Sequence, residues 1–233
     1  MNIKKLVFYI TIITIIISII YITPAFFYDI KKLEKTDPFP TSFMKYRMKQ
    51  WENEGLKKQL KHTWVPLSQI SRPMRLAVIV SEDSKFWQHD GFDYEAIKNA
   101  FEENFKSGRF KYGASTISQQ VAKNLYLTPT KNPLRKIKEA IITHRIEQTL
   151  SKKRILEIYL NIIELGDGIF GVQEAAKFYF GKPASSLTIT EASLLAAILP
   201  NPIKYHPKSN QKFVTNRARI ISSRIMKIES YKK

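Results

Sequence analysis

The chain has 233 residues, with 38 Lys or Arg against 20 Asp or Glu and a formal net charge of +18. It has no cysteine, which excludes a disulfide-stapled scaffold and a thiolate zinc site. Its 14 Phe, 11 Tyr and 3 Trp exclude an intrinsically disordered chain. What remains is a basic globular protein with an anionic partner: nucleic acid, a membrane surface or a phosphate-bearing substrate.

The N-terminus carries an apolar, uncharged stretch from Leu6 to Ile22. Its length is near the lower limit of ~17–25 residues for a transmembrane helix. A cleaved signal peptide is the alternative, but no small-x-small cleavage site follows the stretch. We therefore expect an uncleaved anchor within residues 1–28. Lysines flank both ends, so charge alone leaves the side of the membrane open.

The rest of the chain divides into a short linker and one domain. Residues 29–41, with Pro38 and Pro40, are expected to form a stiff juxtamembrane linker. Residues 42–233 contain no internal repeat, no low-complexity segment and no second Pro/Gly-rich boundary. They are long enough to form a single domain with a sizeable core.

Helical periodicity dominates this domain, and polar residues that can cap a helix precede several apolar stripes. The expected caps are Asp93, Ser115, Asn132, Ser151 and Thr188. After Asp93, an inward face is expected at Ala96, Ile97, Ala100, Phe101 and Phe105. A last helix is expected near residues 213–228. Strand signals are sparse and short, so the predicted fold class is mainly α.

The first candidate site is the segment E-D-S-K-F-W-Q-H-D-G at residues 82–91. It follows an apolar run, Leu76 to Val80, that can form a buried helix ending at Glu82. The helix dipole disfavours an anion at that end, which suits a general base that accepts a proton. A solvated Glu-Asp pair in a helix-ending loop is the alternative.

The second candidate site begins after Gly113 and continues into a helix. Thr116, Gln120 and Lys123 lie at i, i+4 and i+7, which places them in one polar stripe. A helix N-terminus with free N–H groups attracts oxyanions. A solvent-facing polar stripe on an ordinary amphipathic helix is the alternative.

The third candidate site is a group of charged residues after this helix. Arg135 and Glu139 lie at i, i+4 and can form a simple surface salt bridge. With Lys123, Lys131 and Lys136 they could instead form a cationic cluster for a pyrophosphate, held in position by Glu139. No metal-ligand motif is present, since no two of His62, His89, His144 and His206 stand at i, i+4 spacing.

Four segments together resemble the signature motifs of the peptidoglycan glycosyltransferases, glycosyltransferase family 51. In chain order they are E-D-S-K-F-W-Q-H-D-G, G-A-S-T-I-S-Q-Q-V-A-K-N-L, R-K-I-K-E and K-R-I-L-E-I-Y-L-N. The flanks W-V-P-L-S-Q-I-S (64–71) and L-L-A-A-I-L-P-N-P (194–202) resemble the monofunctional biosynthetic transglycosylases of Gram-negative bacteria. The resemblance covers about residues 40–228.

This resemblance implies a lysozyme-like, mainly α domain preceded by one transmembrane helix, with a jaw region partly embedded in the membrane. The implied activity is peptidoglycan synthesis for the cell wall, by elongation of glycan chains from lipid II. The GlcNAc 4-hydroxyl of lipid II attacks the lipid-linked glycan with inversion, and undecaprenyl pyrophosphate leaves. The implied location is the inner membrane, single-pass, with the domain on the periplasmic side.

The resemblance also implies a role for individual residues. Glu82 matches the catalytic general base, and Glu139 matches the second essential acid. The residues expected to bind substrate are Lys123, Lys131, Arg135, Lys136, Asp83, Phe86, His89, Ser115, Thr116, Gln119 and Gln120. At Lys131 the family commonly has Arg; Lys keeps the charge but loses the bidentate fork.

No tightly bound cofactor and no protein metal site are expected, although a divalent cation such as Mg or Mn can stimulate the family. The expected partners are lipid II, the growing glycan chain, the membrane and proteins of cell-wall elongation or division, with no nucleic acid. Two alternatives remain. A lysozyme-like hydrolase or lytic transglycosylase also uses a glutamate in a cleft, but it needs no cationic cluster. A membrane-anchored basic binding protein for nucleic acid or anionic lipid needs neither Glu82 nor Glu139.

Overall fold

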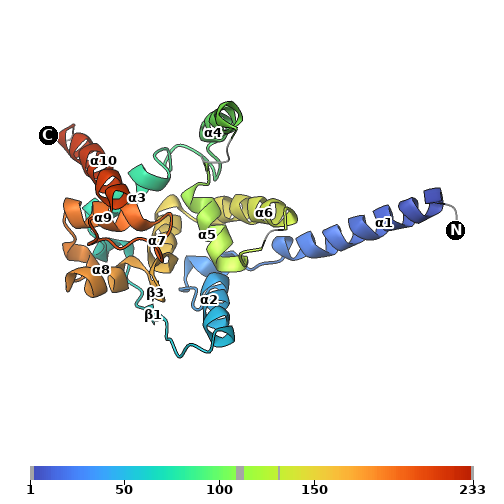
Figure 1. Ribbon diagram of the computed structural model, residues 1–233, viewed down its shortest axis with the longest axis horizontal. Helices are drawn as coiled ribbons and strands as arrows, with labels where there is room; N and C mark the ends of the chain where they lie inside the picture. Colours follow the sequence, from blue (N-terminus) through green and yellow to red (C-terminus); the bar gives the residue numbers. More distant parts are fainter. Residues whose placement is uncertain (1–2, 109–112, 131, 232–233) are drawn as a thin grey trace.

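The computed structural model describes residues 3–108, 113–130 and 132–231 (Figure 1). As the sequence predicts, the fold is mainly α, with ten α-helices in these ranges. They are α1 Ile3–Ile22, α2 Ser42–Asn53, α3 Arg72–Glu82, α4 Tyr94–Ser107, α5 Ile117–Tyr126, α6 Leu134–Thr149, α7 Lys152–Ile162, α8 Val172–Phe180, α9 Ile189–Ile198 and α10 Lys212–Ser230. Short 3-10 helices span Thr23–Phe26, Lys31–Glu34, Leu67–Gln69 and Ala184–Ser186.

One small sheet accompanies the helices. Its strands are β1 Lys61–His62, β2 Glu164–Gly166 and β3 Ile169–Phe170, in the order β1-β3-β2. β1 runs parallel to β3, and β2 runs antiparallel to it. The sheet joins the loop before α3 to the turn after α7, so it fixes two segments that are far apart in the sequence.

Most of the expected helix caps are confirmed. The side chains of Asp93, Ser151 and Thr188 each accept a hydrogen bond from the backbone N–H three residues later. Helix α5 begins one residue later than expected, because Thr116 is the cap in place of Ser115 and forms a capping box with Gln119. The amide oxygen of Asn132 accepts from the N–H of Leu134, where α6 begins.

The core is built around α7, whose residues from Ile158 to Ile162 are all buried. Helix α5 packs against it, and α3 and α9, which pack against each other, contribute further fully buried side chains. The polar side chain of Asn161 is completely enclosed: its amide donates to Val65 and Glu157 carbonyls and accepts from the N–H of Val65. A satisfied buried amide of this kind fixes the chain before α3 relative to α7.

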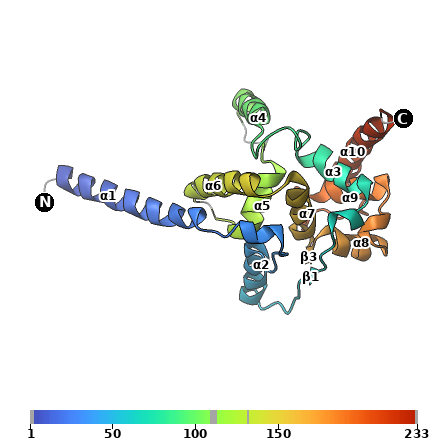
Figure 2. The ribbon, with the colours of Figure 1, turned by 180° about the vertical axis from the view of Figure 1, so that it is seen from behind.

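Helix α4 corrects one expectation. The face predicted to point inward carries Ile97, Phe101 and Phe105, which are 40%, 69% and 80% exposed. Figures 1 and 2 show α4 standing away from the helical core. The spacing correctly identified an apolar helix face, but no other described element covers that face.

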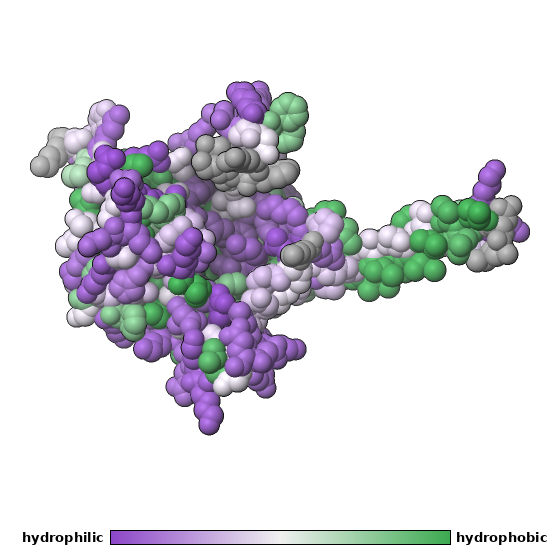
Figure 3. Space-filling model, in the orientation of Figure 1, coloured by the Kyte–Doolittle hydropathy of each residue, from purple (hydrophilic) through white to green (hydrophobic). Residues whose placement is uncertain are grey.

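Helix α1 projects from the domain as an isolated rod, and none of its residues is buried (Figure 1). Its side chains are largely apolar along its length (Figure 3). Within the described ranges it is the one helix long and apolar enough to cross a membrane.

The segment that follows α1 is docked onto the domain along much of its length. Ile30 and Leu33 are buried in the core. Arg145 of α6 donates to the carbonyls of Ala25 and Tyr28 at 2.7 and 2.8 Å. Arg154 of α7 donates to the carbonyls of Leu33 and Thr36. Arg154 therefore attaches the stretch expected to be a stiff linker, residues 29–41, to the domain, and Arg145 attaches the residues just before it.

Candidate active site

Glu82 lies where the sequence places it, in the last turn of α3 after the buried residues from Ala77 to Val80. Both of its carboxylate oxygens accept a hydrogen bond. Gln120 Nε2 donates to Oε2 at 2.9 Å, and Arg217 Nη2 donates to Oε1 at 3.0 Å. The Glu82 side chain is 15% exposed. A carboxylate held in this way has one orientation and still keeps lone pairs for a proton.

A cavity of about 180 Å³ opens at Glu82. The side of the cavity opposite α3 is formed by the segment from Gly113 to Thr116, which leads into α5. Asp83, Ser84, Asp93 and Arg224 are among its other lining residues. The first two sequence motifs therefore meet at one cavity.

Asp83 connects the segments that line this cavity. Its carboxylate accepts from the backbone N–H of Ile117 at 2.9 Å, at the start of α5, and from His89 Nε2 at 2.8 Å. The N–H of Gly91 donates to His89 Nδ1, which assigns the ring proton to Nε2. Asp83 and His89 thus join the loop after α3 to the N-terminus of α5.

Phe86 is fully buried and lies under the same loop. Its ring packs edge-on against Trp87, with a centroid distance of 5.0 Å, and Lys152 Nζ lies 4.7 Å from the ring centroid. Phe86 is therefore placed to support the loop from the core. Contact with a substrate is left to its exposed neighbours.

The polar residues of α5 divide into two groups. The side chains of Thr116 and Gln119 are buried and bond to each other's backbone in the capping box. Thr116 Oγ1 also donates to the carbonyl of Gly91. Gln120 points to Glu82, and the exposed Ser115 lies 3.4 Å from Lys136 Nζ. Ser115 and Gln120 are the members of this set that face the site.

Glu139 forms the centre of the expected charged cluster. It is 2% exposed, and its two carboxylate oxygens accept from Arg135 Nη1 at 3.0 Å and Lys136 Nζ at 2.5 Å. The i, i+4 and i, i+3 spacings on α6 produce these contacts directly. Lys136 is the more exposed of the two cations, with 54% of its side chain accessible.

Lys123 interacts electrostatically with both carboxylates. Burial lowers the pKa of its ammonium group, and the charges of Arg135 and Lys136 lower it further. The carboxylates of Glu139 and Glu82 oppose this shift. The Glu139 cluster borders the Glu82 cavity through Lys136, whose Nζ lies 3.4 Å from Ser115 Oγ, and Ser115 lines that cavity.

Lys131 and Arg135 are the remaining candidate residues for binding an anion. Lys131 lies outside the described residues. Arg135 has a buried Nε atom without a hydrogen-bond partner in the described part of the chain. A buried donor that lacks an acceptor carries a cost that an anionic ligand can remove.

Two residues of the site were not predicted from the sequence. Arg217 of α10 contacts Glu82 across 135 residues of chain, and a long-range contact of this kind has no local signal. Tyr159 was predicted only as a core residue of α7. Its phenol donates to Gln120 Oε1 at 3.2 Å, and burial raises its pKa well above the ordinary value, so it remains a donor.

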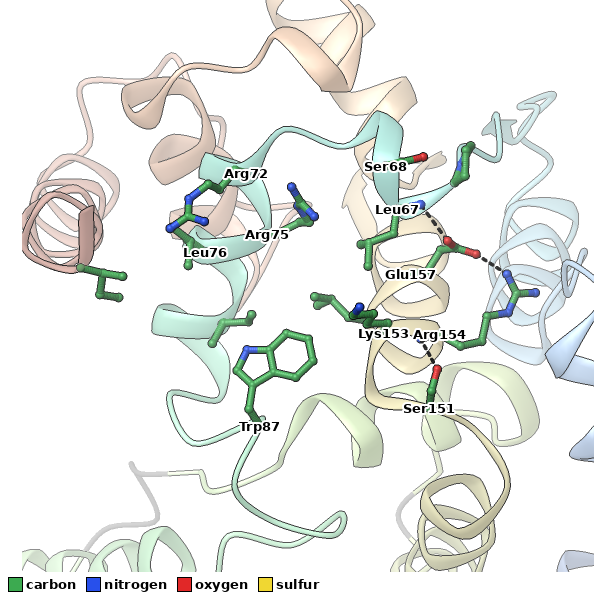
Figure 4. A pocket seen from close by; sticks show the side chains of 14 residues that line it. Leu67, Ser68, Arg72, Arg75, Leu76, Trp87, Ser151, Lys153, Arg154 and Glu157 are labelled. Carbon is green, nitrogen blue, oxygen red and sulfur yellow. Dashed lines mark hydrogen bonds and ion pairs between the residues drawn. The ribbon is translucent and has the colours of Figure 1, made fainter. Parts of the chain in front are cut away.

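A larger cavity, of about 720 Å³, lies away from Glu82 (Figure 4). Arg72, Arg75 and Leu76 line it from α3, and Lys153 and Glu157 line it from α7. Arg154 and the N–H of Leu67 both bond to Glu157 there. None of the predicted site residues lines this cavity, so its size alone does not identify it as the reaction site.

No three His, Asp or Glu side chains within 3–108, 113–130 and 132–231 come together as a metal-binding group. The two acids of the site are instead engaged by nitrogen donors, Glu82 by Gln120 and Arg217, and Glu139 by Arg135 and Lys136. This set of residues suits an anionic ligand better than a metal ion.

Comparisons with known proteins identify the family of this chain. A family described as transglycosylase matches residues 49–226. A biosynthetic peptidoglycan transglycosylase of Azoarcus sp. (strain BH72) is 47% identical over 79% of this chain and 80% of its own length. Namesakes from Nitrosospira multiformis and Janthinobacterium sp. (strain Marseille) are 44% identical over 81% of this chain and 82% of their own, and 39% over 95% and 96%. The chain therefore belongs to the transglycosylase family and is a glycosyltransferase.

Proposed function

We propose that the protein is a peptidoglycan polymerase that elongates glycan chains from lipid II. The glycan is transferred from its undecaprenyl pyrophosphate to the GlcNAc 4-hydroxyl of lipid II, with inversion at the sugar carbon. The observation that carries this proposal is that the Glu139 cluster borders the Glu82 cavity: Lys136, bonded to Glu139, lies 3.4 Å from Ser115, which lines that cavity. One site thus offers a base and, beside it, cations for a leaving pyrophosphate.

Glu82 is the proton acceptor in this reaction. The acceptor hydroxyl oxygen bonds to C1 of the donor MurNAc while the bond from C1 to the pyrophosphate oxygen breaks. The hydroxyl proton passes to the Glu82 carboxylate, and the pyrophosphate leaves with the bonding electrons. Attack from the face opposite the leaving group turns the α configuration into β.

The cations act on the leaving group. Lys123, Arg135 and Lys136 are placed to stabilise the charge that develops on the pyrophosphate. Glu139 forms an ion pair with both Arg135 and Lys136, and its negative charge offsets the repulsion between these two cations. Ser115, beside Lys136, can donate a hydrogen bond to the same anion.

We propose no tightly bound cofactor. A divalent cation used by the family would be held mainly by substrate oxygens, because the acids of this site already bond to nitrogen donors. No step of the mechanism is assigned to such a cation here.

The proposed location is the inner membrane, with α1 as a single anchor and the domain on the periplasmic side. The exposed face of α4 is proposed to enter the outer leaflet, which is the side from which a lipid-linked substrate arrives. Proteins of cell-wall elongation or division are proposed as partners. With a lipid pyrophosphate as substrate, the net charge of +18 needs no nucleic acid to account for it.

The test is polymerisation of labelled lipid II by the full-length protein and by Glu82→Gln. This substitution removes the proton acceptor with little change in volume, so we expect no polymer and an unchanged fold. Glu52→Gln, on the exposed surface of α2, is the matched control and is expected to polymerise normally. Full glycan synthesis by Glu82→Gln would overturn the assignment of the base.

The same assay separates the competing enzyme class. A lysozyme-like hydrolase or lytic transglycosylase would shorten purified glycan strands and leave lipid II unpolymerised. We expect the opposite pattern, with polymer formed from lipid II and intact strands left unchanged.

A further inference from the structure

Arg217 reaches the general base from the far end of the chain. Its Nη2 atom donates to Glu82 Oε1 at 3.0 Å and also lies 3.3 Å from the carbonyl of Ser81. The two side chains are 30% and 15% exposed, so solvent only partly screens the pair. Gln120 donates to the other oxygen of Glu82. Within the described residues, Arg217 is therefore the one charged group that donates a hydrogen bond to this carboxylate.

Other charged groups surround Glu82 from every neighbouring element. Asp83 follows it on α3 and is bonded to His89, and Asp93 lines the same cavity. Lys123 faces it from α5, Tyr159 from α7 and Arg224 from α10. Of the charged groups around Glu82, Arg217 is the one that donates a described hydrogen bond to its carboxylate.

From this geometry, and resting on the proposed function, we propose that Arg217 is a positioning residue for Glu82. Together with Gln120 it holds the carboxylate in one orientation for the arriving acceptor hydroxyl. Arg217 has no contact with reacting atoms in this role and acts only through the base.

The test compares kcat and KM for lipid II in full-length wild type, Arg217→Gln and Arg217→Lys. A lost charge-assisted contact to the base is expected to lower kcat by roughly 10- to 100-fold. KM is expected to stay close to that of wild type, because Arg217 acts on the base and not on the substrate. Arg217→Lys keeps the charge and is expected to restore a part of kcat.

Arg219→Gln is the matched control, since it removes an exposed arginine two residues away on the same helix. It is expected to leave kcat and KM unchanged. A loss in folded Arg217→Gln that lies in KM alone, or that Arg217→Lys does not restore in part, would overturn the proposal. No loss at all would also overturn it.

A second measurement does not depend on turnover. Crystal structures of wild type and Arg217→Gln show the orientation of the Glu82 carboxylate directly. We expect Glu82 to leave its wild-type orientation in Arg217→Gln, and an unchanged orientation contradicts the proposal. Inactivity of wild type on lipid II, with Glu82 displaced in Arg217→Gln, would instead contradict the proposed function alone.

Discussion

The phenol of Tyr159 donates a hydrogen bond to Gln120 Oε1, and this contact turns the amide nitrogen of Gln120 toward Glu82. An amide has two ends that differ in hydrogen bonding, and a donor on the oxygen leaves only the nitrogen for the carboxylate. Tyr159, in the fourth motif, thus determines that the amide nitrogen of Gln120, in the second motif, faces the Glu82 carboxylate.

Tyr159→Phe is expected to lower polymerisation several-fold, because Gln120 can then turn its oxygen toward the Glu82 carboxylate. The unsatisfied amide oxygen is expected to lower the free energy of unfolding by about 1–3 kcal/mol. Steady-state rates and thermal unfolding measure the two effects. Tyr179→Phe is the control: its phenol donates to the carbonyl of Leu165, so it should be destabilised with its rate intact. Equal rates in the two variants would contradict this role.

Lys123→Met is expected to abolish most activity while raising the melting temperature. Burial disfavours the ammonium charge, so removing it relieves a cost in the free protein, whereas the substrate loses a phosphate contact. A loss of roughly 10- to 100-fold in the rate is expected for one charge-assisted contact. Lys45→Met, on the exposed side of α2, should change neither property. A lower melting temperature for Lys123→Met would contradict the burial argument.

The stability difference between Lys123→Met and wild type should depend on pH. The pKa of Lys123 is lowered in the folded state, so above that lowered value the unfolded chain holds the proton longer than the folded one. Stability of wild type therefore rises with pH up to about the ordinary value of 10.5. The advantage of Lys123→Met should be largest near neutral pH and shrink toward pH 10.5, as measured by denaturant unfolding. A constant difference across this range would exclude titration of Lys123 as the cause.

Much of this arrangement follows from local sequence. The caps of α4, α7 and α9 and the Arg135–Glu139 contact depend on residues three or four apart, and all are as expected. Contacts between distant segments do not follow in this way. Arg217 and Glu82 meet only because α10 packs beside α3, and periodicity carries no information about that packing.

The exposed apolar face of α4 shows a second limit of prediction from sequence. Apolar spacing identifies which face of a helix is apolar, but the same pattern serves a protein core and a lipid surface. Arg154 gives the reverse case. It lies in the basic run at residues 152–154, a pattern typical of a solvated helix face. Its guanidinium group is nevertheless largely buried against backbone carbonyls.

Glu139→Gln is expected to lower both stability and activity. It keeps the volume but leaves Arg135 and Lys136 next to each other without the opposing charge. Because both cations are partly exposed, the expected loss is about 1–2 kcal/mol, below that of a fully buried pair. Thermal unfolding measures it against Glu103→Gln, whose contact with Lys106 is exposed and should be neutral. An unchanged melting temperature in Glu139→Gln would contradict the assigned holding role.

Phe101→Ser with Phe105→Ser is expected to lower polymerisation in lipid nanodiscs by several-fold, with no change in thermal stability. The two rings are exposed in the protein, so their removal costs the fold little, but it removes apolar area from the bilayer. A short-chain lipid II in detergent should be polymerised normally by this variant. Glu103→Ser with Lys106→Ser, an exposed ion pair on the other side of α4, is the control. Equal losses in nanodiscs and detergent would argue against membrane contact.

The two arginines that hold the chain after α1 also decide where the protein can be shortened. Starting at residue 42 would remove Ile30 and Leu33 from the core and deprive Arg145 and Arg154 of their carbonyl acceptors. Starting near residue 24 would remove only the apolar rod and keep these contacts. The end of α1 is thus held at one position relative to the domain. A membrane crossed by α1 would therefore lie at one fixed distance from the Glu82 cavity.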